Sequence, residues 1–373
     1  MRTVATHSYG SRVGRAMVIA VAFAMIVAAC GDDSAEPEET PATTASVQTT
    51  TTAAPTTTAA PATTAMEVKE WRDGIPCPPE GTLIAYSPLT LEFVWFADII
   101  TAMEEEAAKC GVDVITDDPE NDAQNQVTNI ENMLERGVSA LAVITVDEVT
   151  MAPVAERARD DGIVVVRHVG SLEGYDANVG VPETVFGELI GEVGGEWLLE
   201  AKPGDAPYQV AILNADSLGP NLLDRKQGLK DGFDRVMAGA EYEIVADVEA
   251  WAEDTALDAV AAILAANPDL DVILTSNDVG ALGGLAAIEA AGLTPNVDIA
   301  IVGSLLERGL QAVADGRMPG GITVPGSTHG VGLIEALFRL LAGEEGGFNM
   351  DIPPIKLGND PTEAQRRLDA GEY

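Results

Sequence analysis

Four residues whose side chains can bind a small molecule lie close together near residue 90: Ser87, Glu92, Phe93 and Trp95. Residues 82–87 form a short, mostly apolar run of the kind buried in parallel sheets, and apolar side chains then recur at helical spacing. These four residues therefore surround the carboxyl end of a strand and the start of a helix. Because open parallel sheets bind their ligands at this edge, we expect the turn to line a small-molecule cleft.

The two aromatic residues in this turn each have an alternative position. Phe93 also falls on the buried stripe of its predicted helix, so its ring fits the core equally well. Trp95 lies off that stripe, which favours contact with a ligand or a second lobe over a surface position. The sequence leaves both alternatives open.

A second polar candidate pair, Arg167 and His168, follows the predicted strand 163–166. A charged pair at a strand end seldom belongs to an apolar core, so we expect ligand contacts here. His329 is a further polar candidate, with an exposed loop as its alternative position.

The chain lacks the sequence patterns of common catalytic sites. It has no Gly-x-Ser-x-Gly elbow, no His-Glu-x-x-His motif and no phosphate-binding loop. The glycines of 191–195 and 280–284 lie within helical patterns and indicate close packing. Only three histidines occur, and His7 lies in an expected export signal. We expect a protein that is not an enzyme and has no metal or cofactor.

Length and charge narrow the class of protein further. The 373 residues leave room for two domains and a tail, and the 46% hydrophobic content supports real cores. The formal net charge of −39 argues against nucleic acid as a partner, because binding phosphates requires clustered Lys and Arg. Direct binding to an anionic membrane surface is disfavoured for the same reason.

The N-terminus has the pattern of an export signal. Arginines precede a 14-residue apolar run, 16–29, which is shorter than a membrane-spanning helix. The run ends in Val27-Ala-Ala-Cys30, which closely resembles the bacterial lipobox, in which the cysteine becomes the lipidated first residue. The alternative is an ordinary signal that is cleaved nearby. We expect a signal peptide over 1–29 and a lipid anchor at Cys30.

A Thr-, Ala- and Pro-rich segment follows the anchor. It cannot bury a core, so we expect residues 30–79 to form a disordered tether, with a composition that also invites O-glycosylation. The folded part then lies outside the cytoplasmic membrane, in the cell envelope. Cys77 and Cys110 should both lie at the bottom of the first sheet, either as a disulfide or as two unpaired thiols.

The remaining chain alternates strands with helices, which predicts parallel sheets covered on both faces. Two such runs, divided near Pro203-Gly204, suggest two lobes. The predicted strands are 82–87, 112–115, 141–146, 163–166, 178–181, 209–213, 243–248, 272–275, 300–302 and 321–324. The predicted helices after the first are 122–136, 150–159, 185–199, 222–237, 255–265, 279–291, 307–314 and 330–341.

Several segments in this order resemble ribose-type periplasmic binding proteins. The resemblance is carried by 122–143, Asp224-Arg225 with Gly228 and Gly232-Phe233, Ser276-Asn277-Asp278 with 280–284, and Ile301-Val-Gly303. It covers about residues 80–350 and implies two doubly wound parallel-sheet lobes joined by three hinge crossings. The first lobe would hold 80–183 and 326–352, and the second 184–325 and 353–373.

The resemblance also implies site residues. Ser87 and Phe93 match ligand contacts of the first lobe, Trp251 matches an aromatic residue that stacks on a sugar, and Asn277 matches an amide that binds hydroxyls. Aromatic faces and amides suit a sugar or polyol. For Asn277 the alternative is a cap on the following helix.

Departures from the family pattern leave the identity of the ligand open. The expected Asp-Arg pair falls near Val169-Gly170, an expected acid is replaced by Ser304-Leu305, and an expected polar residue falls within 324–326. The pocket is therefore less polar than a pentose site, or uses Arg167, His168, Glu92 and His329 instead. We expect Arg225 to pair with Asp224 or with its helix surroundings.

Together with the lipobox-like cysteine, the resemblance implies a monomeric, lipid-anchored solute receptor that delivers a sugar or polyol to an ABC permease. The alternatives are a chemosensory receptor of the same fold that acts through a membrane sensor and, less favoured, a secreted hydrolase. The sequence does not decide between transport and signalling.

Overall fold

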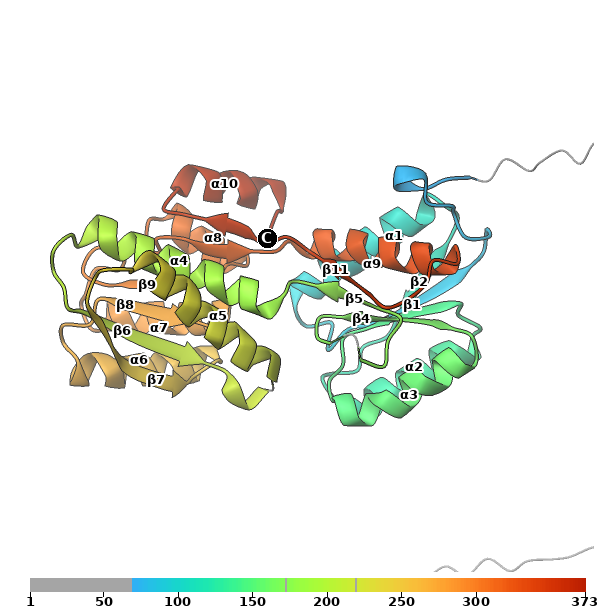
Figure 1. The fold of residues 1–373 in the computed structure, drawn as a ribbon, viewed down its shortest axis with the longest axis horizontal. Helices are drawn as coiled ribbons and strands as arrows, with labels where there is room; N and C mark the ends of the chain where they lie inside the picture. Colours follow the sequence, from blue (N-terminus) through green and yellow to red (C-terminus); the bar gives the residue numbers. More distant parts are fainter. Residues whose placement is uncertain (1–68, 172, 219) are drawn as a thin grey trace, which may run out of the picture. The chain divides into compact units, whose positions relative to one another are not determined.

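Short apolar runs that alternate with longer amphipathic ones form two mainly parallel sheets, each covered by helices on both faces. A computed structural model describes residues 69–171, 173–218 and 220–373 (Figure 1). The predicted signal peptide, Cys30 and most of the predicted tether lie outside these residues. Within them, no helix is both long and apolar enough to cross a bilayer.

The first sheet has the strand order β2–β1–β3–β4–β5–β11, and all neighbouring strands are parallel. Its strands are β1 (Leu83–Ser87), β2 (Asp113–Thr116), β3 (Ala140–Val143), β4 (Val164–His168), β5 (Ala177–Gly180) and β11 (Phe348–Asp351). Helices α1 (Val94–Ala108) and α9 (Gly326–Leu341) pack on one face (Figure 1). Helices α2 (Ala123–Glu135) and α3 (Glu148–Asp160) pack on the other.

The second sheet repeats this order as β7–β6–β8–β9–β10–β12. Its strands are β6 (Tyr208–Asn214), β7 (Tyr242–Glu249), β8 (Val272–Thr275), β9 (Ala300–Ser304), β10 (Gly321–Thr323) and the antiparallel β12 (Ile355–Leu357). Helices α4 (Glu183–Ala201) and α5 (Pro220–Val236) cover one face. The other face carries α6 (Glu253–Ala266), α7 (Asp278–Ala290), α8 (Glu307–Ala314) and α10 (Pro361–Ala370). Two short 3₁₀ turns, Arg72–Gly74 and Asp216–Leu218, complete the described elements.

The chain passes between the sheets three times, from β5 to α4, from β10 to α9 and from β11 to β12. The predicted fold class of two doubly wound lobes with three crossings is therefore confirmed. The last three elements, β11, β12 and α10, were not predicted. The two strands span only four and three residues and are largely half-buried or exposed, so they carry no strong apolar signal.

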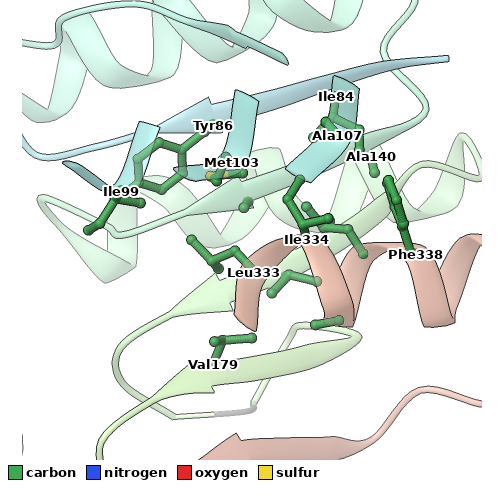
Figure 2. Packing of buried hydrophobic residues seen from close by; sticks show 14 of the residues in the cluster. Ile84, Tyr86, Ile99, Met103, Ala107, Ala140, Val179, Leu333, Ile334 and Phe338 are labelled. Atoms are coloured by element: carbon green, nitrogen blue, oxygen red, sulfur yellow. The ribbon is translucent and has the colours of Figure 1, made fainter. Parts of the chain in front are cut away.

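The core of the first sheet lies between the strands and the pair of helices α1 and α9. Figure 2 shows side chains from β1, α1 and α9 packed against one another. Fully buried members include Ile84, Tyr86, Ile99, Met103, Leu333, Ile334 and Phe338. Each large apolar side chain buried in this way contributes about 1.5–3 kcal/mol. The core therefore fixes where β1 ends and α1 begins, which is the turn expected to line a cleft.

Helices α4 and α5 approach each other unusually closely, because glycines face each other across their contact. A Cβ atom added at Gly187 or Gly191 would overlap backbone oxygens of α5, and one added at Gly228 or Gly232 would overlap backbone oxygens of α4. Only glycine lets two helix backbones come this near. The sequence reading of close packing at 191–195 is therefore confirmed for Gly191.

Residues 69–79 pack onto the first sheet, although their sequence predicted a part of the disordered tether. Trp71 is buried, and its Nε1 donates a hydrogen bond to Glu106 Oε2 at 3.1 Å. Glu106 is itself buried and also pairs with Arg72 and with Lys109, whose Nζ lies 2.7 Å away. A disulfide joins Cys77 to Cys110, with their Cα atoms 5.4 Å apart. The tryptophan, the ion pairs and the disulfide attach this segment to the end of α1.

Candidate functional site

A cavity of about 370 Å³ lies where the carboxyl ends of strands from both sheets meet the crossings. This volume is in the range of small-molecule sites. Most of its wall is aromatic and aliphatic: Phe93, Trp95, Val169, Val181, Phe186, Trp251, Val279, Leu305, Leu306, Ile322 and Val324. The remaining lining residues are polar: Glu183, Arg225, Asn277, Asp278, Ser304, Thr323 and His329.

Aromatic rings dominate the wall, and they are positioned in different ways. Phe93 caps the start of α1 and is 58% exposed, so the alternative of a core position is wrong. Trp251 follows β7 and is 42% exposed. Trp95 is more rigid, because its Nε1 donates to the Val324 carbonyl at 3.1 Å and its ring stacks on His168. Two accessible rings and one fixed ring thus offer flat apolar surfaces to a ligand.

A buried row of three polar rings supports Trp95. The Tyr86 hydroxyl lies 2.9 Å from His168 Nδ1, and His168 Nε2 lies 2.9 Å from His329 Nδ1. Burial lowers the pKa of His329 to about 4 and lowers the pKa of His168 well below its ordinary value. Burial also raises the pKa of the Tyr86 phenol. All three rings are therefore neutral near pH 7, and the last of them, His329, lines the cavity.

The charged residues of the wall are largely paired already. Arg225 Nε donates to Glu183 Oε2 at 2.6 Å, its Nη1 donates to the Ser276 carbonyl at 2.8 Å, and its guanidinium lies 4.0 Å from the Phe186 ring centroid. Arg225 therefore pairs with Glu183 and not with the neighbouring Asp224. The sequence could not show this pairing, because 42 residues separate the partners.

Asn277 and Asp278 begin helix α7. The Asn277 side chain accepts from Gly280 N at 3.0 Å, as a helix cap, and its Nδ2 donates to the Trp251 carbonyl at 2.7 Å. The structure therefore shows the capping role that the sequence analysis gave as the alternative. Asp278 is half-buried, and desolvation raises the pKa of its carboxyl group. The cap positions the Trp251 backbone beside the cavity.

Val169 has a backbone conformation that is rare for a β-branched residue, with φ of 58°. Two hydrogen bonds hold it there: its N–H donates to the Val179 carbonyl at 2.9 Å, and its carbonyl accepts from Arg167 Nε at 2.9 Å. The Arg167 guanidinium also pairs with Glu148 and lies 5.1 Å from the Tyr175 ring centroid. Arg167 thus positions a strained apolar residue in the wall.

The structure brings together four of the eight predicted ligand residues. Phe93, Trp95, Trp251 and Asn277 line the cavity, whereas Ser87, Glu92, Arg167 and His168 do not. Glu92 is exposed. Ser87 is buried, and its hydroxyl accepts a hydrogen bond from Gln126 at 3.2 Å. Arg167 and His168 are buried behind the wall, where they contact Val169 and His329.

Several lining residues were not chosen from the sequence. Val169 and Leu305 were noted only as departures from a family pattern, and Glu183 and Phe186 carried no signal beyond following a strand. His329 is buried within α9, so its alternative position in an exposed loop is wrong. A usable signal was its location four residues beyond Pro325, at the second crossing.

The arrangement suits recognition of a small neutral molecule. Its wall combines broad apolar surfaces with a few fixed polar groups, which is typical of ligand sites. Within the described part of the chain, no group of three or more His, Cys, Asp or Glu side chains is placed to hold a metal ion. The groups on the wall can stack against a ring and donate or accept hydrogen bonds.

Comparison with known proteins places these features in a family. The Periplasmic binding protein domain matches residues 84–345, which include the cavity and all strands except β11 and β12. The D-ribose/D-allose-binding protein of Pseudomonas aeruginosa is 31% identical over 48% of this chain and 56% of its own length. The ribose import binding protein RbsB of Salmonella typhimurium is 23% identical over 69% of this chain and 83% of its own length.

Solved structures share the fold. An ABC transporter periplasmic solute binding protein from Actinobacillus succinogenes with bound D-allose has a TM-score of 0.66 at 25% identity, covering 76% of this chain and 99% of that chain. An ABC transporter solute binding protein from Bacillus halodurans with bound myo-inositol has a TM-score of 0.65 at 21% identity, covering 79% of this chain and 99% of that chain. At 21% identity, the similarity to the Bacillus halodurans protein is evidence for the fold alone.

Proposed function

This chain belongs to the periplasmic binding protein family, and from that premise we propose that it is an extracytoplasmic receptor that binds a sugar or polyol for an ABC importer. The relatives named for ribose and allose binding support a sugar. The relatives are binding proteins, which agrees with a role that requires no catalysis.

One observation carries the proposal: the cavity combines accessible aromatic rings with fixed hydrogen-bonding groups. The Phe93 and Trp251 rings can cover the C–H faces of a sugar ring. Asp278, Ser304 and His329 can meet hydroxyl groups. We therefore assign Phe93, Trp95 and Trp251 to the ligand, with Asn277 lining the cavity as the cap of α7, while Arg167 and His168 support the wall from behind.

Binding would act by shifting the receptor toward a closed arrangement of its lobes, proposed as 80–183 with 326–352 and 184–325 with 353–373. A ligand that contacts both lobes stabilises the closed state by its differential affinity for that state. The lining includes residues from both lobes, such as Trp95 in α1 and Trp251 after β7, as this mode of action requires.

The proposed location is the outer face of the cytoplasmic membrane, with Cys30 as the lipid anchor. The lipobox-like sequence and the Thr/Ala/Pro-rich tether support this location. Residues 69–79 then join the tether to the folded part through the buried Trp71 and the Cys77–Cys110 bond.

The proposal is tested by a thermal-shift screen of D-ribose, D-allose, D-xylose, myo-inositol, nucleosides and amino acids. A ligand at 100 times its Kd stabilises the native state by about 2.7 kcal/mol. For a folded part of about 300 residues this corresponds to a rise in Tm of about 4 °C. Trp251→Ala should reduce the rise without lowering the Tm of the free protein. A rise with nucleosides or amino acids and none with sugars or polyols would contradict the proposal.

A further inference from the structure

The buried row of Tyr86, His168 and His329 links the core of the first sheet to the cavity wall. Tyr86 and His168 are 0% exposed, and His329 is 2% exposed. The rings belong to β1, β4 and α9, so elements that are distant in the sequence hold them in line. Trp95 packs against two rings of the row. Its ring stacks on His168, and it meets the His329 ring edge-on with their centroids 4.9 Å apart.

The two hydrogen bonds of the row can run in either of two directions, depending on which nitrogen of each histidine carries the proton. In the first, the Tyr86 O–H donates to His168 Nδ1, and His168 Nε2–H donates to His329 Nδ1. In the second, each bond is reversed. The Tyr86 hydroxyl then accepts from His168, and no described residue other than His168 hydrogen-bonds to this hydroxyl. Its own proton would be left unpaired in an apolar core, which is unfavourable.

The first direction also determines the protonation of the last ring. His329 Nδ1 accepts a hydrogen bond from His168, so a neutral His329 carries its proton on Nε2. No described group hydrogen-bonds to this Nε2, and His329 lines the cavity. The low pKa of His329, which follows from burial, agrees with a neutral ring.

We propose that the Tyr86–His168–His329 row fixes His329 as a neutral Nε2–H donor, and that this donor binds an oxygen atom of an uncharged ligand in the cavity. The second half of this inference rests on the proposed function. His329 is thus a specificity-determining residue, and Tyr86 and His168 are positioning residues. A fixed N–H favours a hydroxyl, ether or carbonyl oxygen and disfavours an ammonium group at the same place.

The tautomers can be tested without any ligand. We suggest long-range ¹H–¹⁵N correlation spectra of histidine side chains in the mature chain, which holds His168 and His329. The expected result at pH 7 is a protonated Nε2 and an unprotonated Nδ1 in both rings. A His329 that carries its proton on Nδ1, or on both nitrogens, would overturn the proposal.

Two tyrosine variants test the role of the row. Tyr86→Phe removes the hydroxyl that starts it, so both histidines should lose their single tautomer. Tyr175→Phe is the matched control, because the Tyr175 hydroxyl donates to Glu148 at 3.1 Å and lies outside the row. Tyr175→Phe should leave the histidine spectra unchanged. If Tyr86→Phe also leaves them unchanged, Tyr86 does not set the tautomers and the proposal fails.

The contact with ligand is tested by titration calorimetry with D-ribose, D-allose and myo-inositol. His329→Leu should weaken binding about tenfold, the usual effect of losing one hydrogen bond. His329→Gln, which retains an N–H donor, should lose much less. Equal losses in both variants, or none in either, would refute the donor role. If none of the three probes binds the parent protein while the spectra show Nε2–H, the proposed sugar function fails and the tautomer assignment stands.

Discussion

Acidification should destabilise this protein through His329. The side chain is buried in neutral form, and burial lowers its pKa from 6.5 to about 4. Between these values the unfolded chain binds a proton that the native state excludes, so the free energy of unfolding falls as pH decreases. The stabilising contribution is complete above pH 6.5 and is lost as the pH falls toward 4.

The size of the effect follows from the two pKa values. Moving from pH 7 to pH 5 should cost about 2 kcal/mol from His329 alone, and the full loss below pH 4 is about 3 kcal/mol. His168 acts in the same direction, because burial and the neighbouring His329 lower its pKa as well. Removing His329 would therefore also weaken the pH dependence that arises from His168.

The assay is urea unfolding followed by tryptophan fluorescence at pH 7 and pH 5, for the parent protein and His329→Gln. The difference between the two proteins excludes the contribution of the 60 acidic residues to the pH dependence of stability, because both proteins contain them. The parent should lose about 2 kcal/mol more than the variant between the two pH values. Equal losses in both proteins would show that His329 is not buried in a neutral form.

Three further changes have clear expectations. Gly191→Ala places a methyl group against the α5 backbone and should lower the free energy of unfolding by about 2 kcal/mol, measured in urea. Gly358→Ala is the control and should have little effect, because a Cβ atom there meets nothing within 4 Å. Equal effects would contradict the close packing of α4 and α5. Replacing both Cys77 and Cys110 by Ala removes a cross-link between residues 33 apart in the sequence. The loss of chain-entropy restriction should lower the free energy of unfolding in urea by about 4 kcal/mol. An unchanged free energy of unfolding would contradict a disulfide that stabilises the fold. Cys30→Ser should release the protein from the membrane fraction of producing cells, and continued anchoring would refute the lipobox assignment.

The fold could be predicted because it depends on local patterns. The alternation of apolar strands and helices predicted parallel sheets covered on both faces in two lobes, and the family resemblance implied that the lobes are doubly wound. The helix around Phe96 and Met103 was recognised by its spacing. The strands β11 and β12 were missed because short, largely half-buried or exposed strands resemble loops, and the helix α10 was missed as well.

The site was predicted in position more reliably than in detail. Ser87 and His168 are the last residues of β1 and β4, and both turn into the protein. Val169, one residue further, lies on the cavity wall. A sequence places a strand end only to within a residue or two, and one residue changes the face on which a side chain lies.

Partners distant in the chain could not be predicted at all. Arg225 pairs with Glu183, and His329 meets His168 across 161 residues, only because folding brings their elements together. The sequence placed Arg225 with Asp224 or its helix surroundings and left His329 with an exposed loop as its alternative. Whether a polar side chain binds a ligand or another side chain depends on such tertiary neighbours.

The most direct test of ligand binding in this cavity is the fluorescence of its tryptophans. Trp95 and Trp251 line the cavity, whereas Trp71 and Trp197 are buried elsewhere in the fold. A sugar or polyol that raises the Tm should change the emission of the parent protein, and the change should disappear in the Trp95→Phe, Trp251→Phe double variant. An equal change in that variant would show that the ligand binds somewhere else.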